Sequence, residues 1–168
     1  MIAFETSTRI GRPIEQVFSY VADPLNLARW NSAVQDVQKT APGDTGAAST
    51  YVMVRDLPSG RAVNRLEIVA IEPPNDLVIR ASEGPTPFLY HYRFSAESGE
   101  TFLHLSAEVE LPRPAALLPQ LARSAVRRGV DANFAALKAL LEGQASRASM
   151  SPGGTAPSRR SRHSPSRS

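Results

Sequence analysis

Residues 2–30 read IAFETSTRIGRPIEQVFSYVADPLNLARW, and the spacing of their apolar residues changes once. Over residues 2–10 apolar side chains alternate with polar or small ones, which is the period of a half-buried strand. After a Gly and a Pro, the apolar positions of residues 14–22 recur three and four residues apart, which predicts a short amphipathic helix. Asp23 can cap a second short helix over residues 25–30. The chain therefore begins with one strand and two short helices.

The segment from residue 32 to residue 111 predicts consecutive strands separated by turn residues. The expected strands are 32–40, 49–56, 61–71, 77–82, 87–96 and 101–111. Short connections between successive strands favour antiparallel pairing, because parallel neighbours need long crossovers. We therefore expect an antiparallel meander.

A long helix is predicted from about residue 114 to residue 142, with Pro119 either in its first turn or at a break after a short preceding turn. Its apolar and small residues fall on one stripe at about 100° per residue, opposite Arg127, Asp131 and Lys138. The predicted inward stripe comprises Leu118, Ala122, Val126, Gly129, Val130, Asn133, Leu137 and Leu140. A curved antiparallel sheet whose apolar face is covered by one long helix is an α+β fold.

Charge divides the chain into two parts. It has 168 residues, 42% of them hydrophobic, which suffices for one domain with a core. All 16 acidic residues and 14 of the 19 Lys and Arg lie in residues 1–143, whereas residues 144–168 hold five Arg and no acid. This Ser-, Pro- and Arg-rich segment is predicted to be a disordered tail that is dispensable for folding. It can contact anionic surfaces weakly, but its arginines are not interleaved with aromatic residues, so no specific nucleic-acid binding is expected.

Composition also excludes several chemistries. The chain contains no Cys and only three scattered His, which argues against disulfides, thiolate catalysis and a metal site. No phosphate-binding Gly-rich loop of the required spacing occurs, so neither a nucleotide nor another cofactor is expected. No apolar run is long enough for a transmembrane segment, and the N-terminus lacks the features of a signal peptide, which predicts a cytoplasmic protein.

Three segments carry a resemblance to a known family. They are RIGRPIEQVFSYVADPLNLARWNSAV at 9–34, IEPPNDLVIRA at 71–81 and RRGVDANFAALKALLEG at 127–143. With these segments the chain resembles the START-like (SRPBCC) superfamily of helix-grip domains, and within it the polyketide cyclase/dehydrase-like branch. The resemblance implies a helix-grip domain over residues 1–143, with a curved sheet of about seven strands around the long C-terminal helix. It does not settle the activity, because one fold hosts many functions.

Strand alternation predicts which side chains face the helix. Phe88, Tyr90 and Tyr92 share one face of their strand, so His91 and, on the next strand, His104 should face outward. In residues 61–71 the more apolar face is predicted to comprise Ala62, Asn64, Leu66, Ile68 and Ala70. In residues 49–56 the register stays open, since Tyr51 with Met53 and Val52 with Val54 are both plausible inward pairs, with Tyr51 slightly favoured.

The candidate ligand-binding residues follow from these faces and from the resemblance, which implies that Trp30 lies near a pocket mouth. They are Trp30, Tyr51, Asn64, Leu66, Ile79, Phe88, Tyr90, Tyr92, Leu105, Val126, Gly129 and Asn133. Plain core packing explains many of them equally well. For Asn133 a hydrogen bond to a neighbouring backbone group is the simpler explanation.

Three hypotheses of function remain, and the third is that the domain interacts with another protein. The first is binding of a small hydrophobic or amphipathic ligand, such as a lipid, polyketide or aromatic metabolite, in a cavity between sheet and helix. The alternative is a polyketide cyclase or dehydratase that uses the pocket tyrosines. A tyrosine with a pKa near 10 is a poor base at neutral pH, so no catalytic residue is assigned. The sequence names neither the ligand nor the oligomeric state.

Overall fold

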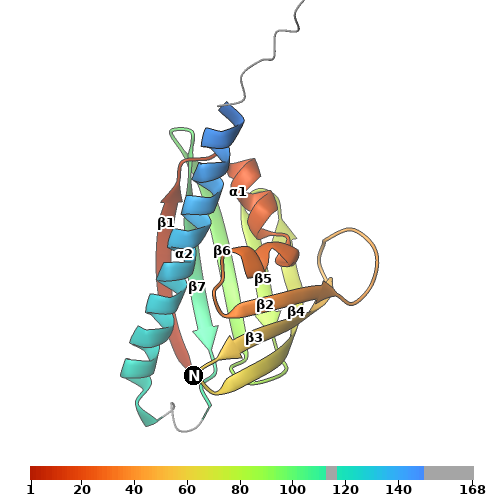
Figure 1. The fold of residues 1–168 in the computed structure, drawn as a ribbon, viewed down its shortest axis with the longest axis vertical. Coiled ribbons are helices and arrows are strands. Elements are labelled where there is room, and N and C mark those ends of the chain that lie inside the picture. The colour runs from red at the N-terminus through yellow and green to blue at the C-terminus, as the bar shows by residue number, and fades with distance from the viewer. Residues whose placement is uncertain (113–116, 150–168) are drawn as a thin grey trace, which may run out of the picture.

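The computed structural model describes residues 1–112 and 117–149, and it contains seven strands and three helical segments in that range (Figure 1). Their order is β1 (Ile2–Ile10), α1 (Ile14–Val21), the 3-10 helix η1 (Pro24–Arg29), β2 (Val34–Lys39), β3 (Thr50–Leu57), β4 (Gly60–Glu72), β5 (Asp76–Ala81), β6 (Phe88–Glu97), β7 (Glu100–Val109) and α2 (Pro119–Ser149). Asp23 caps η1, since its side chain accepts a hydrogen bond from the Leu25 backbone N–H, as the sequence predicts.

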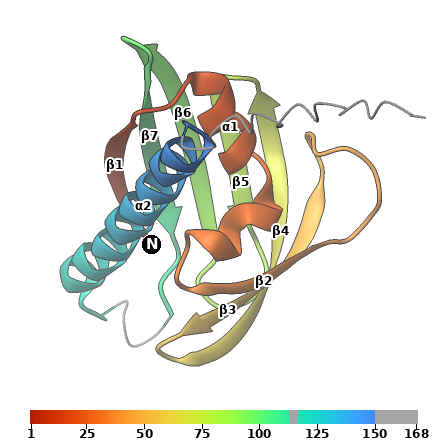
Figure 2. The same ribbon diagram turned by 45° about the horizontal axis from the view of Figure 1, so that its top comes forward.

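The strands form one antiparallel sheet in the order β1-β7-β6-β5-β4-β3-β2. All neighbours except β1 and β7 are consecutive in the chain, and β1 joins β7 with Ile2 opposite Val109. The helices α1, η1 and α2 lie on one side of this sheet, here called the inner face (Figure 2). The predicted α+β helix-grip fold is confirmed.

The predicted alternation along the strands is confirmed except at Ala70, and the open register is settled. Tyr51 is fully buried, whereas Val52 is 39% exposed, so Tyr51 and Met53 face inward. The prediction for Ala70 is wrong. A β-bulge between Ile68 and Ala70 interrupts the pairing of β4 with β5 and shifts the alternation, which leaves Ala70 exposed.

The helix α2 has two different halves. In α2 none of the described residues before Val130 is buried, and its buried stripe consists of Val130, Phe134, Leu137 and Leu141. Leu118 and Gly129, which were predicted to face inward, are instead exposed. A helical wheel ranks the faces of a helix, but it does not tell where along its length the sheet lies beneath it.

The C-terminal end of α2 also differs from the predicted one. The described helix begins at Pro119, which fits the expected place of this residue in the first turn. The predicted start near residue 114 lies outside the described residues. At its other end α2 continues to Ser149, past the domain boundary predicted at residue 143. The remainder of the predicted tail, residues 150–168, also lies outside the described residues.

Polar contacts fix α2 along the edge strand β1. Asp131 accepts a hydrogen bond from the Thr6 hydroxyl, and Lys138 Nζ donates to the Arg9 carbonyl oxygen at 2.6 Å. Glu142 accepts from the Gly11 backbone N–H at 2.8 Å, and this bond lowers the pKa of Glu142. The helix is thereby tied to one edge of the sheet.

Candidate ligand-binding site

The inner face of β6 carries a row of four aromatic side chains. At one end of this row Phe94 meets Phe18 of α1 edge to face, with ring centroids 5.1 Å apart. The adjacent Tyr92 is 4% exposed, and its ring lies 6.5 Å from that of Phe134 on α2. Side chains of α1 and α2 therefore cover this end of the row.

The other end of the row is less covered. Phe88 and Tyr90 are only half buried, and their ring centroids lie 4.3 Å apart. Val126, in the half of α2 that has no buried residue, is half buried and packs against the core. Solvent therefore reaches part of the apolar inner face here. We call Phe88, Tyr90 and Val126, together with Arg55 described below, the open end.

The hydroxyl groups of Tyr90 and Tyr92 have no hydrogen-bond partner among the described residues. Burial raises the pKa of Tyr90 to about 12, against a smaller opposing effect of the Arg55 charge. Burial also raises the pKa of Tyr92, with a further contribution from Tyr90. Both side chains are therefore neutral at physiological pH and can donate a hydrogen bond.

A buried arginine lies at the open end. Arg55 is on the inner face of β3 and only 9% exposed, and its Nε donates to Asn64 Oδ1 at 2.9 Å. Its guanidinium carbon lies 5.7 Å from the centroid of the Phe88 ring. Arg55 is not among the residues predicted from the sequence, although the alternation that places Tyr51 inward places Arg55 inward as well.

Arg55 and Asn64 together hold the loop of residues 82–87 between β5 and β6. Arg55 Nη2 donates to the Pro85 carbonyl oxygen and to Thr86 Oγ1, both at 2.8 Å. Asn64 Nδ2 donates to the carbonyl oxygens of Glu83 and Pro85. The prediction that Asn64 faces inward is confirmed, and its amide is occupied by these contacts.

Five of the other candidates are buried in the core. These are Trp30, Tyr51, Leu66, Ile79 and Leu105. The Tyr51 hydroxyl forms a hydrogen bond of 3.1 Å with Thr45 Oγ1. The buried indole Nε1 of Trp30 has no hydrogen-bond partner among the described residues.

The remaining two candidates lie on the side of α2 that is turned away from β1. Asn133 Oδ1 accepts a hydrogen bond from the Ser32 backbone N–H at 3.1 Å, which agrees with the simpler explanation of this residue. Gly129 is exposed, and a Cβ atom at this position would have no neighbour within 4 Å. The structure thus brings together Phe88, Tyr90 and Tyr92, but it leaves Asn133 in a separate contact.

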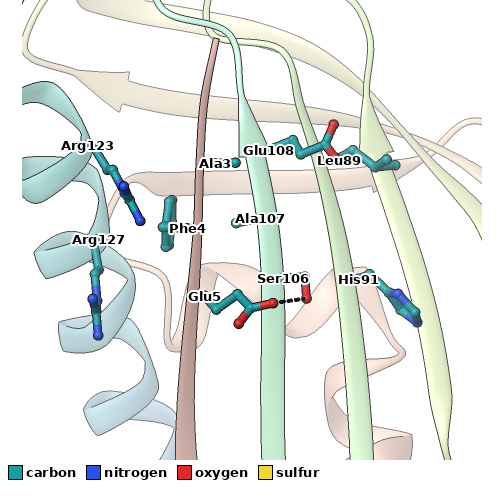
Figure 3. A pocket seen from close by; sticks show the side chains of 10 residues that line it. All are labelled: Ala3, Phe4, Glu5, Leu89, His91, Ser106, Ala107, Glu108, Arg123 and Arg127. Atoms are coloured by element: carbon teal, nitrogen blue, oxygen red, sulfur yellow. Dashed lines mark hydrogen bonds between the residues drawn. The ribbon is translucent and has the colours of Figure 1, made fainter. Parts of the chain in front are cut away.

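A groove of about 710 Å³ lies outside the predicted site, along the outward side chains of β1, β7 and β6 (Figure 3). Its lining includes Glu5, His91 and Glu108 of the strands together with Arg123 and Arg127 of α2. None of the candidate residues lines it. Its charged groups face solvent, where ion pairs stabilise little.

Both histidines of the sheet face outward, as predicted. His91 Nε2 lies 2.6 Å from Asp76 Oδ1, and His104 Nε2 lies 3.9 Å from Glu5 Oε1. The described residues contain no cluster of three or more His, Cys, Asp or Glu that could hold a metal ion. In the same part of the chain no helix is long and apolar enough to cross a membrane.

A sheet that holds one long helix against an aromatic inner face defines a helix-grip domain, and comparison with known proteins gives its family. The chain belongs to the family described as polyketide cyclase / dehydrase and lipid transport, whose model matches residues 1–142. Comparison with curated proteins found no match.

Similar solved structures agree with this fold. The protein TTHA0849 from Thermus thermophilus is 18% identical with a TM-score of 0.68, and the match covers 89% of this chain and 100% of that one. A START superfamily protein from Mycobacterium smegmatis is 16% identical with a TM-score of 0.64, covering 87% and 98%. StfQ, a di-domain ARO/CYC protein of the steffimycin biosynthetic pathway, is 16% identical with a TM-score of 0.67, covering 86% and 52%. At these identities the likeness shows the fold alone.

Proposed function

We propose that this protein binds a small hydrophobic or amphipathic molecule on the inner face of the sheet, beside α2 at the open end. The observation that carries the proposal is the change in burial along the β6 row, from enclosed Phe94 to half-buried Phe88. A row that served only as core would be covered along its whole length. Apolar rings left partly uncovered beside polar donors are typical of ligand sites.

The polar groups beside this row support the proposal. Buried hydrogen-bonding groups almost always have a partner, because an unpaired one costs about 1–3 kcal/mol. Among the described residues, the buried side-chain atoms without one are the hydroxyl of Tyr20 and the indole Nε1 of Trp30. The hydroxyls of Tyr90 and Tyr92 are not among these buried atoms, and no hydrogen bond within the described residues occupies them. A bound molecule with an acceptor oxygen would supply partners for the tyrosines, while its apolar part would cover the Phe88 ring.

The family is compatible with this function in a general way. Its description joins two activities, polyketide cyclisation or dehydration and lipid transport. Both involve largely apolar molecules that carry a few oxygen atoms. The proposed ligand for this chain has the same character.

Catalysis on a polyketide-like chain is the second candidate, and the raised pKa values of the tyrosines bear on it. A neutral Tyr90 or Tyr92 can donate a hydrogen bond to a substrate carbonyl, but it is a poor general base. Among the described residues no hydrogen bond links either hydroxyl to a carboxylate or an imidazole. Binding therefore has the stronger support.

A matched pair of variants tests the site. Phe88 and Leu89 are neighbours on β6, but Phe88 faces inward and Leu89 lies in the outer groove. Titration with the neutral fluorophore N-phenyl-1-naphthylamine should show about tenfold weaker binding for Phe88→Ala, because the lost ring removes apolar contact area. Leu89→Ala should remain within about twofold of the wild type. Weakening by Leu89→Ala alone would move the site to the outer groove.

Tyr92→Phe separates the two candidate functions, because it removes only the hydroxyl group. If the protein is a carrier, native mass spectrometry of the purified wild type and variant should show the same retained molecule. If the wild type converts a polyketide-like substrate and Tyr92→Phe binds it equally well without converting it, the enzyme function is favoured.

A further inference from the structure

Arg55 is a buried cation whose hydrogen-bond partners are all neutral. Its Nε donates to the amide oxygen of Asn64, and its Nη2 donates to the Pro85 carbonyl oxygen and the Thr86 hydroxyl. No carboxylate of the described residues lies within salt-bridge distance of it. Buried charges in proteins are normally paired, since removing a charge from water without a partner is costly.

The rest of the chain does not supply an acidic side chain either. Residues 113–116 and 150–168 contain no Asp and no Glu. Arg55 therefore has no carboxylate side chain available from either segment. The protein keeps a positive charge on the inner face of its sheet without an acidic residue to balance it.

The guanidinium group also has unused donors. It presents five N–H groups in a planar fork. The hydrogen bonds of the described residues use Nε and Nη2, and none of them involves Nη1. Burial lowers the pKa of Arg55, but an arginine stays protonated in proteins at physiological pH. An anion beside Nη1 would form charge-assisted hydrogen bonds, which are about twice as strong as neutral ones.

The surroundings of Arg55 show what kind of anion would fit. Phe88 lies 5.7 Å from the guanidinium carbon, and Tyr90 is near enough for the Arg55 charge to influence its pKa. Both belong to the half-buried part of the aromatic row. A positive group, a neutral hydroxyl donor and exposed ring surface thus occur together at the open end.

We propose that Arg55 binds the carboxylate, or another singly charged oxyanion, of an amphipathic ligand whose apolar part lies along Phe88 and Tyr90. This inference rests on the proposed function and narrows it to acidic ligands. Arg55 also holds the loop of residues 82–87, which places its guanidinium group in a fixed position. Preorganisation of this kind lowers the cost of binding an anion.

The test compares two probes with the same chain, dodecanoate with a charged carboxylate head and its neutral methyl ester, methyl dodecanoate, each displacing N-phenyl-1-naphthylamine. Wild-type protein should bind dodecanoate about tenfold more tightly or better, as expected for a charge-assisted hydrogen bond. In Arg55→Gln the ratio of the two affinities should fall to about one. The matched control is Arg65→Gln, which removes an exposed charge from the outer face of the adjacent strand and should leave the ratio unchanged.

A second variant retains Arg55 in case Arg55→Gln does not fold, although it removes the amide donor that Asn64 gives to the Glu83 and Pro85 carbonyl oxygens. Asn64→Asp would put a carboxylate where the amide oxygen now lies 2.9 Å from Arg55 Nε, so it should also reduce the ratio to about one. Circular dichroism identifies the variants that are folded.

The outcomes separate this inference from the proposed function. Equal binding of both probes by the wild type would overturn the role of Arg55 and leave a neutral ligand site intact. A preference that survives in folded Arg55→Gln or Asn64→Asp would also overturn it. Binding of neither probe would overturn the proposed function together with the inference.

Discussion

The two ends of the inner face differ in how completely their side chains are buried. At the closed end, by which we mean Phe18, Phe94, Phe134 and Leu137, apolar side chains of α1, β6 and α2 bury one another. At the open end the row continues with half-buried rings and an arginine that no acid balances. One sheet therefore provides both a core and an accessible apolar surface, depending on which helix segment covers it.

The cause of this difference lies in α2. The contacts of Asp131 and Lys138 with β1, and of Glu142 with Gly11 directly after it, fix the C-terminal half of α2 against the edge of the sheet. At its start Leu118 and Leu121 remain exposed. The helix therefore covers the closed end and leaves the open end partly free.

The largest expected effect comes from removing a ring at the closed end. Phe134→Ala should lower the free energy of unfolding by about 3–5 kcal/mol, because it leaves a cavity among buried neighbours. Chemical denaturation gives the value.

Val126→Ala is the matched change at the open end of the same helix, and it should cost about 1 kcal/mol or less, because Val126 is only half buried. Equal losses from the two variants would mean that the ends are packed alike, and the comparison would fail.

The next effect concerns the loop that borders the open end. Gly84 has a φ of +87°, and a Cβ atom there would lie 2.2 Å from the Val63 carbonyl oxygen. Gly84→Ala should therefore destabilise the protein by about 2 kcal/mol or more, through both backbone strain and steric overlap.

Gly99 provides the control for Gly84. It has a φ of +82°, but a Cβ atom at this position would have no neighbour within 4 Å. Gly99→Ala should show the backbone strain alone, at about 1–2 kcal/mol. If both substitutions cost the same in thermal or chemical unfolding, the loop is not held as closely as Arg55 and Asn64 suggest.

Much of the fold could be predicted from the sequence, because strand alternation and helix periodicity are local properties. The inward position of Asn64 follows from a period of two, whereas for Tyr51 the same period left two registers open and favoured the inward one only slightly. The bulge after Ile68 could not be predicted in this way, since it depends on how β4 pairs with β5. The exposure of Gly129 depends likewise on where α2 is attached to β1, far away in the sequence.

The candidate site was predicted only in part. The aromatic row was found because its residues fit the expected chemistry of an inward face. Arg55 lies on the same face of its strand as Tyr51. A charged residue is rarely fully buried, however, so the alternation alone did not indicate that Arg55 belongs to the site. The contacts that hold its guanidinium involve residues 82–87, and their approach to β3 is a tertiary feature.

High pH should lower the stability of the folded protein, because the tyrosines of the row lose their protons more readily when the chain is unfolded. An unfolded tyrosine loses its proton near pH 10, whereas folded Tyr90 keeps it until the pH reaches about 12. The unfolded state is therefore favoured as the pH rises above 10, and the free energy of unfolding should fall over this range.

The tyrosine variants show which end of the row is responsible. Tyr92, at the closed end, also has a raised pKa, so Tyr90→Phe and Tyr92→Phe should each make this decline with pH shallower. Chemical unfolding as a function of pH measures the slopes. A slope that neither variant changes would show that these hydroxyls ionise in the folded state as they do in water.

The smallest expected effect on stability concerns Gly129, in the half of α2 that has no buried residue. Gly in a helix interior costs about 1 kcal/mol relative to Ala, and nothing lies within 4 Å of a Cβ atom at this position. Gly129→Leu should therefore leave the protein folded and stabilise it by up to about 1 kcal/mol. If α2 instead packed closely on the sheet here, overpacking would cost roughly 1–3 kcal/mol. Thermal melting distinguishes the two results by their sign, and a destabilised Gly129→Leu would mean that the open end is closed in solution.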